Sequence, residues 1–505
     1  MRTNCSTSTW FCLALLVPAP LGAAINPASE VVVSWSAGLE TKHVQLLGEG
    51  GVTAVVLPWP GGVATAEFAR ACRAAGITPI AQVAPAKDLA EVRKSVESAR
   101  AAGFGAVALE AEGALSDEKP LRAFLAGLKG LEALVFLKPE QADWQVTPAQ
   151  AVLRAGQWPG SRGGPSMRRG DQDIASASRE PWVDANSYLI AWLRGRRPER
   201  AAWLGYRADE AAGVKKDRVI PYESLEPALV EAYAAGGNVV LSIPERYQAG
   251  LAAGEEKALA AWRALGQTAR FLKQHADTFR QTGAARVGVA AGTFEQSGEL
   301  LNMAYRWNAC PVVFSAGAVP PLDQNRFRVV VAANIPPPAG ANLKRFLGFA
   351  QGGGVLIAVP GAAGDPAWWL APGARKMRSD QDRDVYSVGK GQVIAYREPV
   401  QDPSEFALDV IDALGVRTRD LRLWNASSVI GLLHRPPGQK LSLTLINYGS
   451  PRGFEFPVRV EGVFGKATLI APGGDAPRQL KAVKRGTGTE ITVDRLNRLA
   501  LIALE

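Results

Sequence analysis

The sequence predicts an α/β protein with a (β/α)8 TIM barrel, followed by a flavodoxin-like α/β domain and a small antiparallel β-sandwich. Strand and helix patterns alternate from residue 30 to about residue 283, and a second, shorter alternation follows. From about Leu421 the apolar residues alternate with turn residues, and no helical pattern remains. A chain of 505 residues is also too long for one hydrophobic core. The predicted segments are an export signal at 1–24, the barrel at 25–283, the flavodoxin-like (glutamine-amidotransferase-like) domain at 284–418 and the sandwich at 419–505.

The first 24 residues have the pattern of a secretory signal peptide. Arg2 supplies the positive charge, Trp10 to Val17 form the apolar stretch, and Gly22 and Ala24 are small residues before a cleavage site. The apolar stretch is too short to span a bilayer. We therefore expect a cleaved signal and a secreted or periplasmic protein without a membrane partner. A retained N-terminal anchor is the alternative.

Eight strand-helix repeats, with apolar residues three and four positions apart in the helical runs, predict the barrel. A unit of about 250 residues in this order matches the usual size of a (β/α)8 barrel. The active face of such a barrel is formed by the carboxyl ends of the strands and the loops that follow them, so we expect the chemistry there. The strand candidates are Val31–Ser36, Ala54–Trp59, Thr78–Val83, Ala106–Glu110, Ala133–Lys138, Ala151–Gln157, Ala202–Tyr206 and Val239–Ile243.

The two later units are predicted from shorter patterns. Buried strands of the parallel type at 286–292, 310–317, 327–335 and 353–361 alternate with helices. Val385–Tyr396 has the pattern of a closing hairpin, and Phe406–Leu414 that of a final helix. Segments such as LSLTLINYG and EITVDRL then predict the strands of the sandwich. The sandwich shows no aromatic platform for a glycan, so we expect a structural cap.

The composition argues against several classes of site. His43 and His275 fall on predicted barrel helices and His434 in the sandwich, which argues against a Ser-His triad or a His-ligated metal. No P-loop or dinucleotide-binding glycine motif is present, so we expect no cofactor. Cys72 and Cys310, which remain after signal removal, are interpreted as buried free thiols. The formal charge of +9 forms no basic stripe interleaved with aromatics, so no nucleic acid partner is expected.

The segment GAVALEAEG, residues 105–113, begins as an apolar strand and ends with two acids. Successive side chains of a strand point to opposite faces, so Ala108, Glu110 and Glu112 share one face. Two like charges at a strand end are costly unless a function requires them. Glu110 or Glu112 is the candidate general acid for glycosidic bond cleavage, because burial among Ala and Leu favours a protonated carboxyl group.

Cleavage of a glycosidic bond requires a second carboxylate, which attacks the sugar or activates water. Glu245, after the eighth predicted strand, is the first candidate and Asp184, in the long loop after the sixth, is the second. The structural alternatives are that Glu110 forms an ion pair with Lys138 or Arg154, and that Asp184 is a helix N-cap.

The predicted strand ends and the loops above them are rich in tryptophan. Flat aromatic faces suit the apolar faces of sugar rings, while carboxylates and amides bind the hydroxyl groups. The alternative for any single ring is ordinary packing in the top of the barrel. The predicted substrate-binding residues are Trp35, Trp59, Gln157, Trp158, Trp182, Asn186 and Tyr206.

The order of the three units resembles the layout of family 42 β-galactosidases and related multi-domain glycoside hydrolases. The segment FRVVVAANIPPPAGANLKRFLGFAQGGGVLIAVPG is similar to their trimerisation domain, and VYSVGKGQVIAY resembles the hairpin that closes it. The resemblance covers roughly the last two fifths of the chain well and the barrel in outline. It implies self-association into a homo-oligomer through the middle domain, with a packing spacer as the alternative.

The barrel departs from that family at the catalytic positions. The family shares an Asn-Glu pair after the fourth strand and a Glu at the end of the seventh, whereas these strands here end LEAEG and WLGYRAD. The resemblance therefore implies the acid role for Glu110 or Glu112 alone. For the nucleophile it leaves only Asp209, which matches the family's position poorly. GFGAVALEAEG is also similar to a chitinase-type strand, in which Glu112 would hold the place of the proton donor.

These patterns predict an exported glycoside hydrolase of carbohydrate metabolism that cleaves oligo- or polysaccharides with paired carboxylates at the barrel mouth. The alternative is a non-catalytic carbohydrate-binding or scaffold protein with a degenerate hydrolase barrel. A third interpretation is a lyase that uses Tyr206 or Lys138 as its base. Two carboxyl groups about 5 to 10 Å apart over an open, Trp-lined cleft would favour hydrolysis. Glutamates locked by Lys138, Arg154 or Arg207, with no cleft beside them, would favour the binding or inactive alternative.

Overall fold

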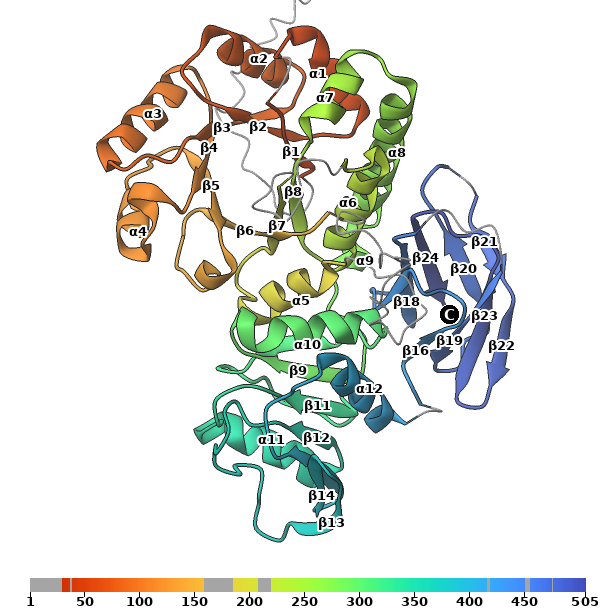
Figure 1. Ribbon diagram of the computed structural model, residues 1–505. Helices are drawn as coiled ribbons and strands as arrows, with labels where there is room; N and C mark the ends of the chain where they lie inside the picture. The colour runs from red at the N-terminus through yellow and green to blue at the C-terminus, as the bar shows by residue number, and fades with distance from the viewer. Residues whose placement is uncertain are drawn as a thin grey trace, which may run out of the picture.

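The computed structural model describes residues 30–36, 39–158, 185–207, 219–415, 418–449, 455–474 and 476–505. The chain forms a closed barrel, a seven-stranded sheet on one side of it and a pair of sheets beside both, as Figure 1 shows. None of the described helices is long and apolar enough to pass through a lipid bilayer. The signal peptide expected at 1–24 lies outside the described residues and stays a prediction.

Eight parallel strands close the barrel, which confirms the predicted fold class. Strand β1 pairs with β2 on one side and with β8 on the other, so that Val32 is the partner of both Ala54 and Val240. The strands are β1 (Val32–Ser34), β2 (Ala54–Pro58), β3 (Thr78–Val83), β4 (Ala106–Glu110), β5 (Glu132–Leu137), β6 (Gln150–Gly156), β7 (Trp203–Tyr206) and β8 (Asn238–Ser242).

The outer layer of the barrel is helical. Asp88 starts one of these helices by accepting a hydrogen bond from the Ala90 backbone N–H at 3.0 Å, which is the usual role of an N-cap. The helices are α1 (Val44–Glu49), α2 (Val63–Ala74), α3 (Leu89–Ala101), α4 (Glu118–Ala126), α5 (Ser187–Arg196), α6 (Leu225–Ala234), α7 (Glu245–Ala252), α8 (Glu256–Gln274) and α9 (Ala276–Phe279), with 3-10 turns η1 (Thr41–His43), η2 (Gly113–Leu115), η3 (Pro139–Gln141) and η5 (Tyr222–Ser224).

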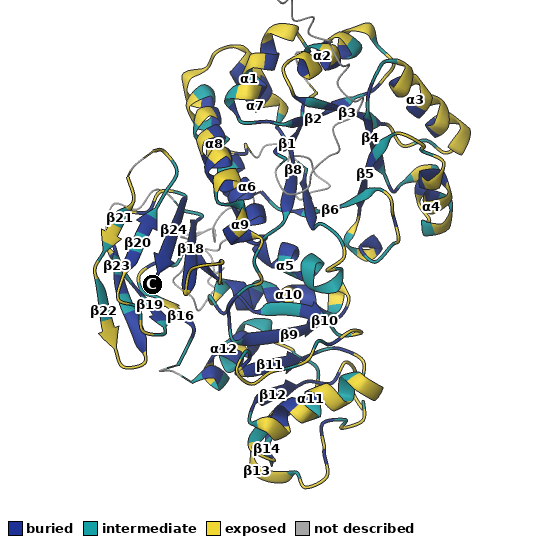
Figure 2. Ribbon diagram, turned by 180° about the vertical axis from the view of Figure 1, so that it is seen from behind, coloured by how far each residue is buried: buried dark blue, intermediate teal, exposed yellow. Residues whose placement is uncertain are grey.

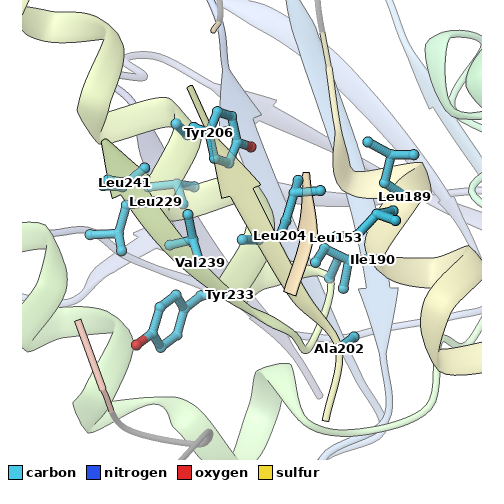
Figure 3. Close-up of a cluster of buried hydrophobic side chains, with 14 of the residues drawn as sticks. Leu153, Leu189, Ile190, Ala202, Leu204, Tyr206, Leu229, Tyr233, Val239 and Leu241 are labelled. Carbon is cyan, nitrogen blue, oxygen red and sulfur yellow. The ribbon is translucent and has the colours of Figure 1, made fainter. Parts of the chain in front are cut away.

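The alternation of side chains along the barrel strands separates two apolar layers. In β4, Ala106 and Ala108 belong to the cluster inside the barrel, whereas Val107 and Leu109 belong to the larger cluster between strands and helices. Figure 3 shows part of this outer layer around β7 and β8. Its labelled side chains are Leu153, Leu189, Ile190, Ala202, Leu204, Tyr206, Leu229, Tyr233, Val239 and Leu241.

The middle unit is a mixed sheet in the order β10-β9-β11-β12-β15-β14-β13. Its five parallel strands run in the 2-1-3-4-5 order of doubly wound sheets such as flavodoxin. The predicted hairpin is present as β14 and β15, and β13 adds an edge strand that the sequence did not indicate. The elements are β9 (Val287–Ala291), α10 (Phe294–Arg306), β10 (Val312–Ser315), β11 (Val329–Ala332), α11 (Gly340–Gly352), β12 (Val355–Ala358), β13 (Arg375–Ser379), β14 (Arg383–Val388), β15 (Gly391–Tyr396) and α12 (Pro403–Leu414).

The C-terminal unit consists of two antiparallel sheets, in the orders β16-β19-β23-β22 and β17-β18-β24-β20-β21. Phe456 and Val458 of the first sheet share one apolar core with Leu443 and Ile502 of the second, as in a sandwich. The strands are β16 (Leu421–Leu423), β17 (Val429–His434), β18 (Leu441–Asn447), β19 (Phe456–Glu461), β20 (Ala467–Ile470), β21 (Arg478–Leu480), β22 (Ala482–Arg485), β23 (Gly488–Val493) and β24 (Leu499–Leu504).

The three units pack closely against one another. Figure 2 shows buried strands in all three, with exposed surfaces on outer barrel helices such as α2 and α3. Helix α5 lies between the barrel and the middle sheet, where the Trp192 indole N–H donates to the Gly292 carbonyl oxygen at 3.2 Å. Gly195 permits the close approach of α5 to β10, because a Cβ there would lie 2.6 Å from the Val313 backbone. The middle sheet and the barrel therefore share a tightly fitted contact.

Candidate functional site

The carboxyl ends of the barrel strands place a charged pair inside the barrel mouth. Glu110 is the last residue of β4 and follows Ala108 on the inner face, above an apolar layer. Arg154 of β6 donates from Nη2 to Oε1 of Glu110 at 2.6 Å, and the Gln82 side-chain amide of β3 lies 3.4 Å from the same oxygen. The Arg154 guanidinium stacks over the Phe136 ring at 3.5 Å from the centroid. The mouth thus has a polar floor, which we define as Gln82, Glu110 and Arg154.

The Glu110–Arg154 pair is largely withdrawn from solvent, since the two side chains are 14% and 9% exposed. A guanidinium at this distance stabilises the charged form of a carboxylate, and removal of water strengthens the attraction. This contact is the structural alternative expected from the sequence, in which Glu110 forms an ion pair with Arg154.

Glu112 lies further out, on the turn that follows β4. Its Oε1 is 3.4 Å from Nζ of Lys138, and both side chains are about half exposed. Gly113, at φ 60°, makes the turn possible, because a Cβ at this position would lie 2.3 Å from the Ala86 carbonyl oxygen. The same turn is fixed by the Ala114 N–H, which donates to that oxygen at 2.7 Å. Glu112 thus stands at a defined place on the rim of the mouth with a solvent-exposed ion pair.

Of the two candidates for the second carboxylate, only Glu245 lies within the described residues. Glu245 is the exposed first residue of α7, a position at which a negative charge is favourable for the helix. It follows β8, which lies opposite β4 in the eight-stranded ring, so the two acids are on opposite sides of the mouth. Asp184 and Trp182 lie outside the described residues. Helix α5 has Asn186, not Asp184, in the N-cap position, so the N-cap interpretation of Asp184 is wrong.

Three of the predicted sugar-stacking rings are buried in the outer apolar layer. Trp35, Trp59 and Trp158 are 0%, 8% and 1% exposed. Trp35 contacts Trp262 edge to face at 6.3 Å between ring centroids. Trp59 contacts Phe104 in the same way at 5.1 Å. The prediction that these rings line an open groove is wrong for all three. The alternation of β1 and β2 turns Trp35 and Trp59 toward the helices, whereas Trp158 lies beyond the end of β6, after a register shift in its pairing with β7.

Trp158 and Tyr206 pack against each other with ring centroids 5.2 Å apart. The Trp158 indole N–H donates to the Arg207 carbonyl oxygen at 2.9 Å, and Tyr206 is fully buried. The placement of Tyr206 at an open binding surface is therefore also wrong. Figure 3 shows Tyr206 within the buried cluster at the end of β7.

Asn186 and Gln157 form a second polar contact near the same strand ends. The Asn186 side chain accepts from the Gln157 backbone N–H at 2.9 Å and donates to the Gln157 carbonyl oxygen at 2.8 Å. Asn186 is 1% exposed, so its predicted contact with substrate is wrong, and its amide is used within the protein.

Glu231, which no sequence pattern singled out, lies at the centre of this buried contact. Its carboxylate accepts from the Asn186 backbone N–H and side-chain amide, both at 2.6 Å, and from the Tyr206 and Tyr448 hydroxyl groups. Burial raises the pKa of Glu231 to about 7, although each of these donors lowers it. Burial also raises the pKa of Tyr206 and of Tyr448. The sequence feature that could have identified Glu231 is a charged residue in the otherwise apolar run LVEAYA.

The described residues contain no group of three or more His, Cys, Asp or Glu side chains arranged to hold a metal ion. Cys72 and Cys310 are buried and unpaired, as predicted. Burial raises the pKa of the Cys72 thiol to about 12 and also raises that of Cys310, so neither thiol is activated as a nucleophile.

No protein-family model matches the sequence, and a comparison with curated proteins finds no match. Solved structures do match along almost the whole chain. α-L-Fucosidase isoenzyme 2 from Paenibacillus thiaminolyticus has a TM-score of 0.58 at 10% identity, over 95% of this chain and 100% of that chain. The β-galactosidase from Bacillus circulans sp. alkalophilus has a TM-score of 0.57 at 8% identity, over 94% and 99%.

A family 42 β-galactosidase from G. stearothermophilus has a TM-score of 0.52 at 10% identity, over 95% of this chain and 99% of that chain. The chain has a glycoside hydrolase fold. The predicted resemblance to family 42 β-galactosidases and other multi-domain glycoside hydrolases is confirmed at the level of structure. Identities of 8–10% show the fold alone.

Proposed function

We propose that this exported protein takes a carbohydrate chain into the mouth of its barrel and cleaves a glycosidic bond there. Glu110 acts as the charged carboxylate and Glu112 as the proton donor. The observation that carries the proposal is the Glu110–Arg154 pair, a carboxylate bound to a guanidinium inside the carboxyl end of the barrel. Export is supported by the pattern of the first 24 residues.

Glycoside hydrolysis divides its work between two carboxyl groups in opposite protonation states. Arg154 places a positive charge beside the Glu110 carboxyl group, an arrangement that suits a nucleophile or a base for water. Glu112 follows two residues later, on the turn after β4, and its side chain is more exposed than that of Glu110, at 41% against 14%. Its ion pair with Lys138 joins two half-exposed side chains and is therefore weak, so a bound sugar can displace Lys138 at small cost.

The polar floor also fits carbohydrate recognition. Gln82 and Arg154 supply fixed N–H donors, and Glu110 supplies acceptor oxygens, in a mouth whose lower layer is apolar. Sugar hydroxyl groups need both kinds of partner, and preorganised side chains bind them at low cost in entropy. The proteins of similar structure include an α-L-fucosidase and β-galactosidases, so these sugars are the first to test.

A second candidate function is glycan binding without cleavage. It is favoured by a specific observation, since each of the two glutamates at the end of β4 is already paired with a cation. The same polar floor would then hold a glycan without a protonated acid beside it.

A single set of variants tests both candidates. The mature chain from residue 25 is assayed with 4-nitrophenyl α-L-fucoside, β-D-galactoside and β-D-mannoside, and with soluble polysaccharides by release of reducing ends. The variants are Glu110→Gln and Glu112→Gln, with Glu245→Gln for the earlier assignment and Glu140→Gln as an exposed control at the neighbouring strand end. Hydrolysis should fall at least about a hundredfold in the first two variants and stay within about twofold in the control.

Binding of the same sugars by calorimetry separates the candidates when no turnover is found. Glycan binding that Glu110→Gln weakens, without turnover of any substrate, would replace cleavage by the second candidate. Turnover that survives in both Glu110→Gln and Glu112→Gln would overturn the assignment of the site.

A further inference from the structure

One buried carboxylate joins the barrel to the C-terminal sandwich. Glu231 lies on α6, a helix whose residues are almost all buried, and its own side chain is fully covered. Its hydroxyl donors come from Tyr206 at the end of β7 and from Tyr448 directly after β18 of the sandwich. Helix α6 also packs against β18. The contact therefore crosses from the barrel to a separate unit.

The donors to Glu231 fit a carboxylate and nothing else of its size. Two oxygens accept four hydrogen bonds: Oε1 from Tyr206 and the Asn186 amide, Oε2 from the Asn186 backbone N–H and Tyr448. A carboxylate can only accept, whereas a glutamine would turn an N–H2 group toward two of these donors. The donors are all neutral, so hydrogen bonds rather than an ion pair compensate the burial of the charge. Such a cluster holds its members in one geometry.

The same cluster fixes the strand ends that border the mouth. Asn186 pairs with both backbone groups of Gln157, the first residue after β6, as a neighbouring strand would. Tyr206 ends β7, and its ring packs on Trp158, whose indole N–H is bound to the Arg207 carbonyl oxygen. Through these contacts Glu231 holds the carboxyl ends of β6 and β7 in place. Arg154, of the polar floor, lies two residues before the end of β6.

We propose that Glu231 and Tyr448 are positioning residues through which the C-terminal sandwich sets the carboxyl ends of β6 and β7. The sandwich then does more than cap the molecule: its Tyr448 hydroxyl completes the cluster that fixes one side of the barrel mouth. This inference goes beyond the proposed function and does not depend on it. It concerns how firmly the backbone at the ends of β6 and β7 is held, whether or not a glycan is cleaved.

Hydrogen exchange of the whole chain tests the proposal, followed by mass spectrometry of peptides that contain the Gln157 amide. Tyr448→Phe removes one hydroxyl group and keeps the ring. Tyr396→Phe is the matched control, because the Tyr396 hydroxyl also donates to a carboxylate, that of Asp409, within the middle unit. Tyr448→Phe should speed exchange at Gln157 about tenfold or more, since a hydrogen bond to a charged group is lost. Tyr396→Phe should leave Gln157 unchanged.

Glu231→Gln should speed exchange in the same peptide at least as much as Tyr448→Phe does, because two of the four donors then face an N–H2 group. Equal exchange at Gln157 in Tyr448→Phe and in the unmodified protein would overturn the proposal. So would equal opening in Tyr448→Phe and Tyr396→Phe, which would show a general loss of stability. Exchange is measured without a glycan, so its outcome is separate from any result on the proposed function.

Discussion

Arg154 Nη2 lies 2.6 Å from Oε1 of Glu110, and the same guanidinium stacks on Phe136 at 3.5 Å from the ring centroid. The pair joins β4 to β6 across the intervening strand β5, inside the mouth. The pair therefore links two barrel strands whether or not a ligand is bound, so its effect on stability can be measured without a sugar.

Arg154→Met should destabilise the protein by about 3 kcal/mol, because it leaves Glu110 without its cation in a mostly buried place. Urea unfolding measures this change. The double variant Arg154→Met with Glu110→Gln should recover more than half of the loss, since no unpaired charge remains. A double variant that is less stable than Arg154→Met alone would contradict the electrostatic explanation.

The pKa of Glu231, raised by burial to about 7, predicts a specific pH dependence of stability. Its folded-state pKa exceeds the ordinary value of 4.5, so the folded protein binds this proton more tightly than the unfolded chain does. The contribution of this group is fully present below pH 4.5 and is lost as the pH rises through 7, by about 3 kcal/mol. Unfolding of the unmodified protein and of Glu231→Gln from pH 4.5 to 8 should therefore show a difference in stability that shrinks with rising pH. A difference independent of pH would rule out this titration.

Gly195→Ala should loosen the contact between the barrel and the middle sheet. The new Cβ would lie 2.6 Å from the backbone of Val313, so the expected loss is about 1–3 kcal/mol. Gly48→Ala is the matched control, because Gly48 lies in α1 with nothing within 4 Å of its Cβ position. That control should gain about 0.4–1 kcal/mol. Thermal unfolding compares the two, and a loss of equal size in both would contradict the packing argument.

Trp35→Ala should cost about 3–5 kcal/mol of stability, since the ring is fully buried against Trp262. Under conditions in which the variant remains folded, its glycan affinity should match that of the unmodified protein. A loss of glycan affinity without a loss of stability would show that Trp35 belongs to the binding surface.

The strands of the barrel could be predicted from sequence because each is a short apolar run bounded by turn residues. Ala54–Trp59 and Thr78–Val83 correspond to β2 and β3 almost residue for residue. The edge strand β13 could not be found this way, since Arg375–Ser379 is exposed throughout and carries no apolar alternation. Its place in the sheet comes from pairing with β14.

The site was predicted well only where alternation was applied. It placed Glu110 on the same face of the strand as Ala108, and the structure shows that Ala108 lies inside the barrel. Trp35 and Trp59 were assigned to the mouth only because they lie at strand ends. Side chains alternate between the two faces of a strand, and these two rings fall on the outward face. Glu231 could not be assigned at all, because its partners Tyr206 and Tyr448 are brought together only by the packing of two units.

The decisive measurement is cleavage of a 4-nitrophenyl glycoside by Glu110→Gln, relative to the unmodified protein and with folding checked by circular dichroism. We expect kcat to fall at least about a hundredfold, while Glu140→Gln keeps its activity. Activity of folded Glu110→Gln within about twofold of the unmodified protein would show that the charged carboxylate at the barrel mouth has no part in the reaction.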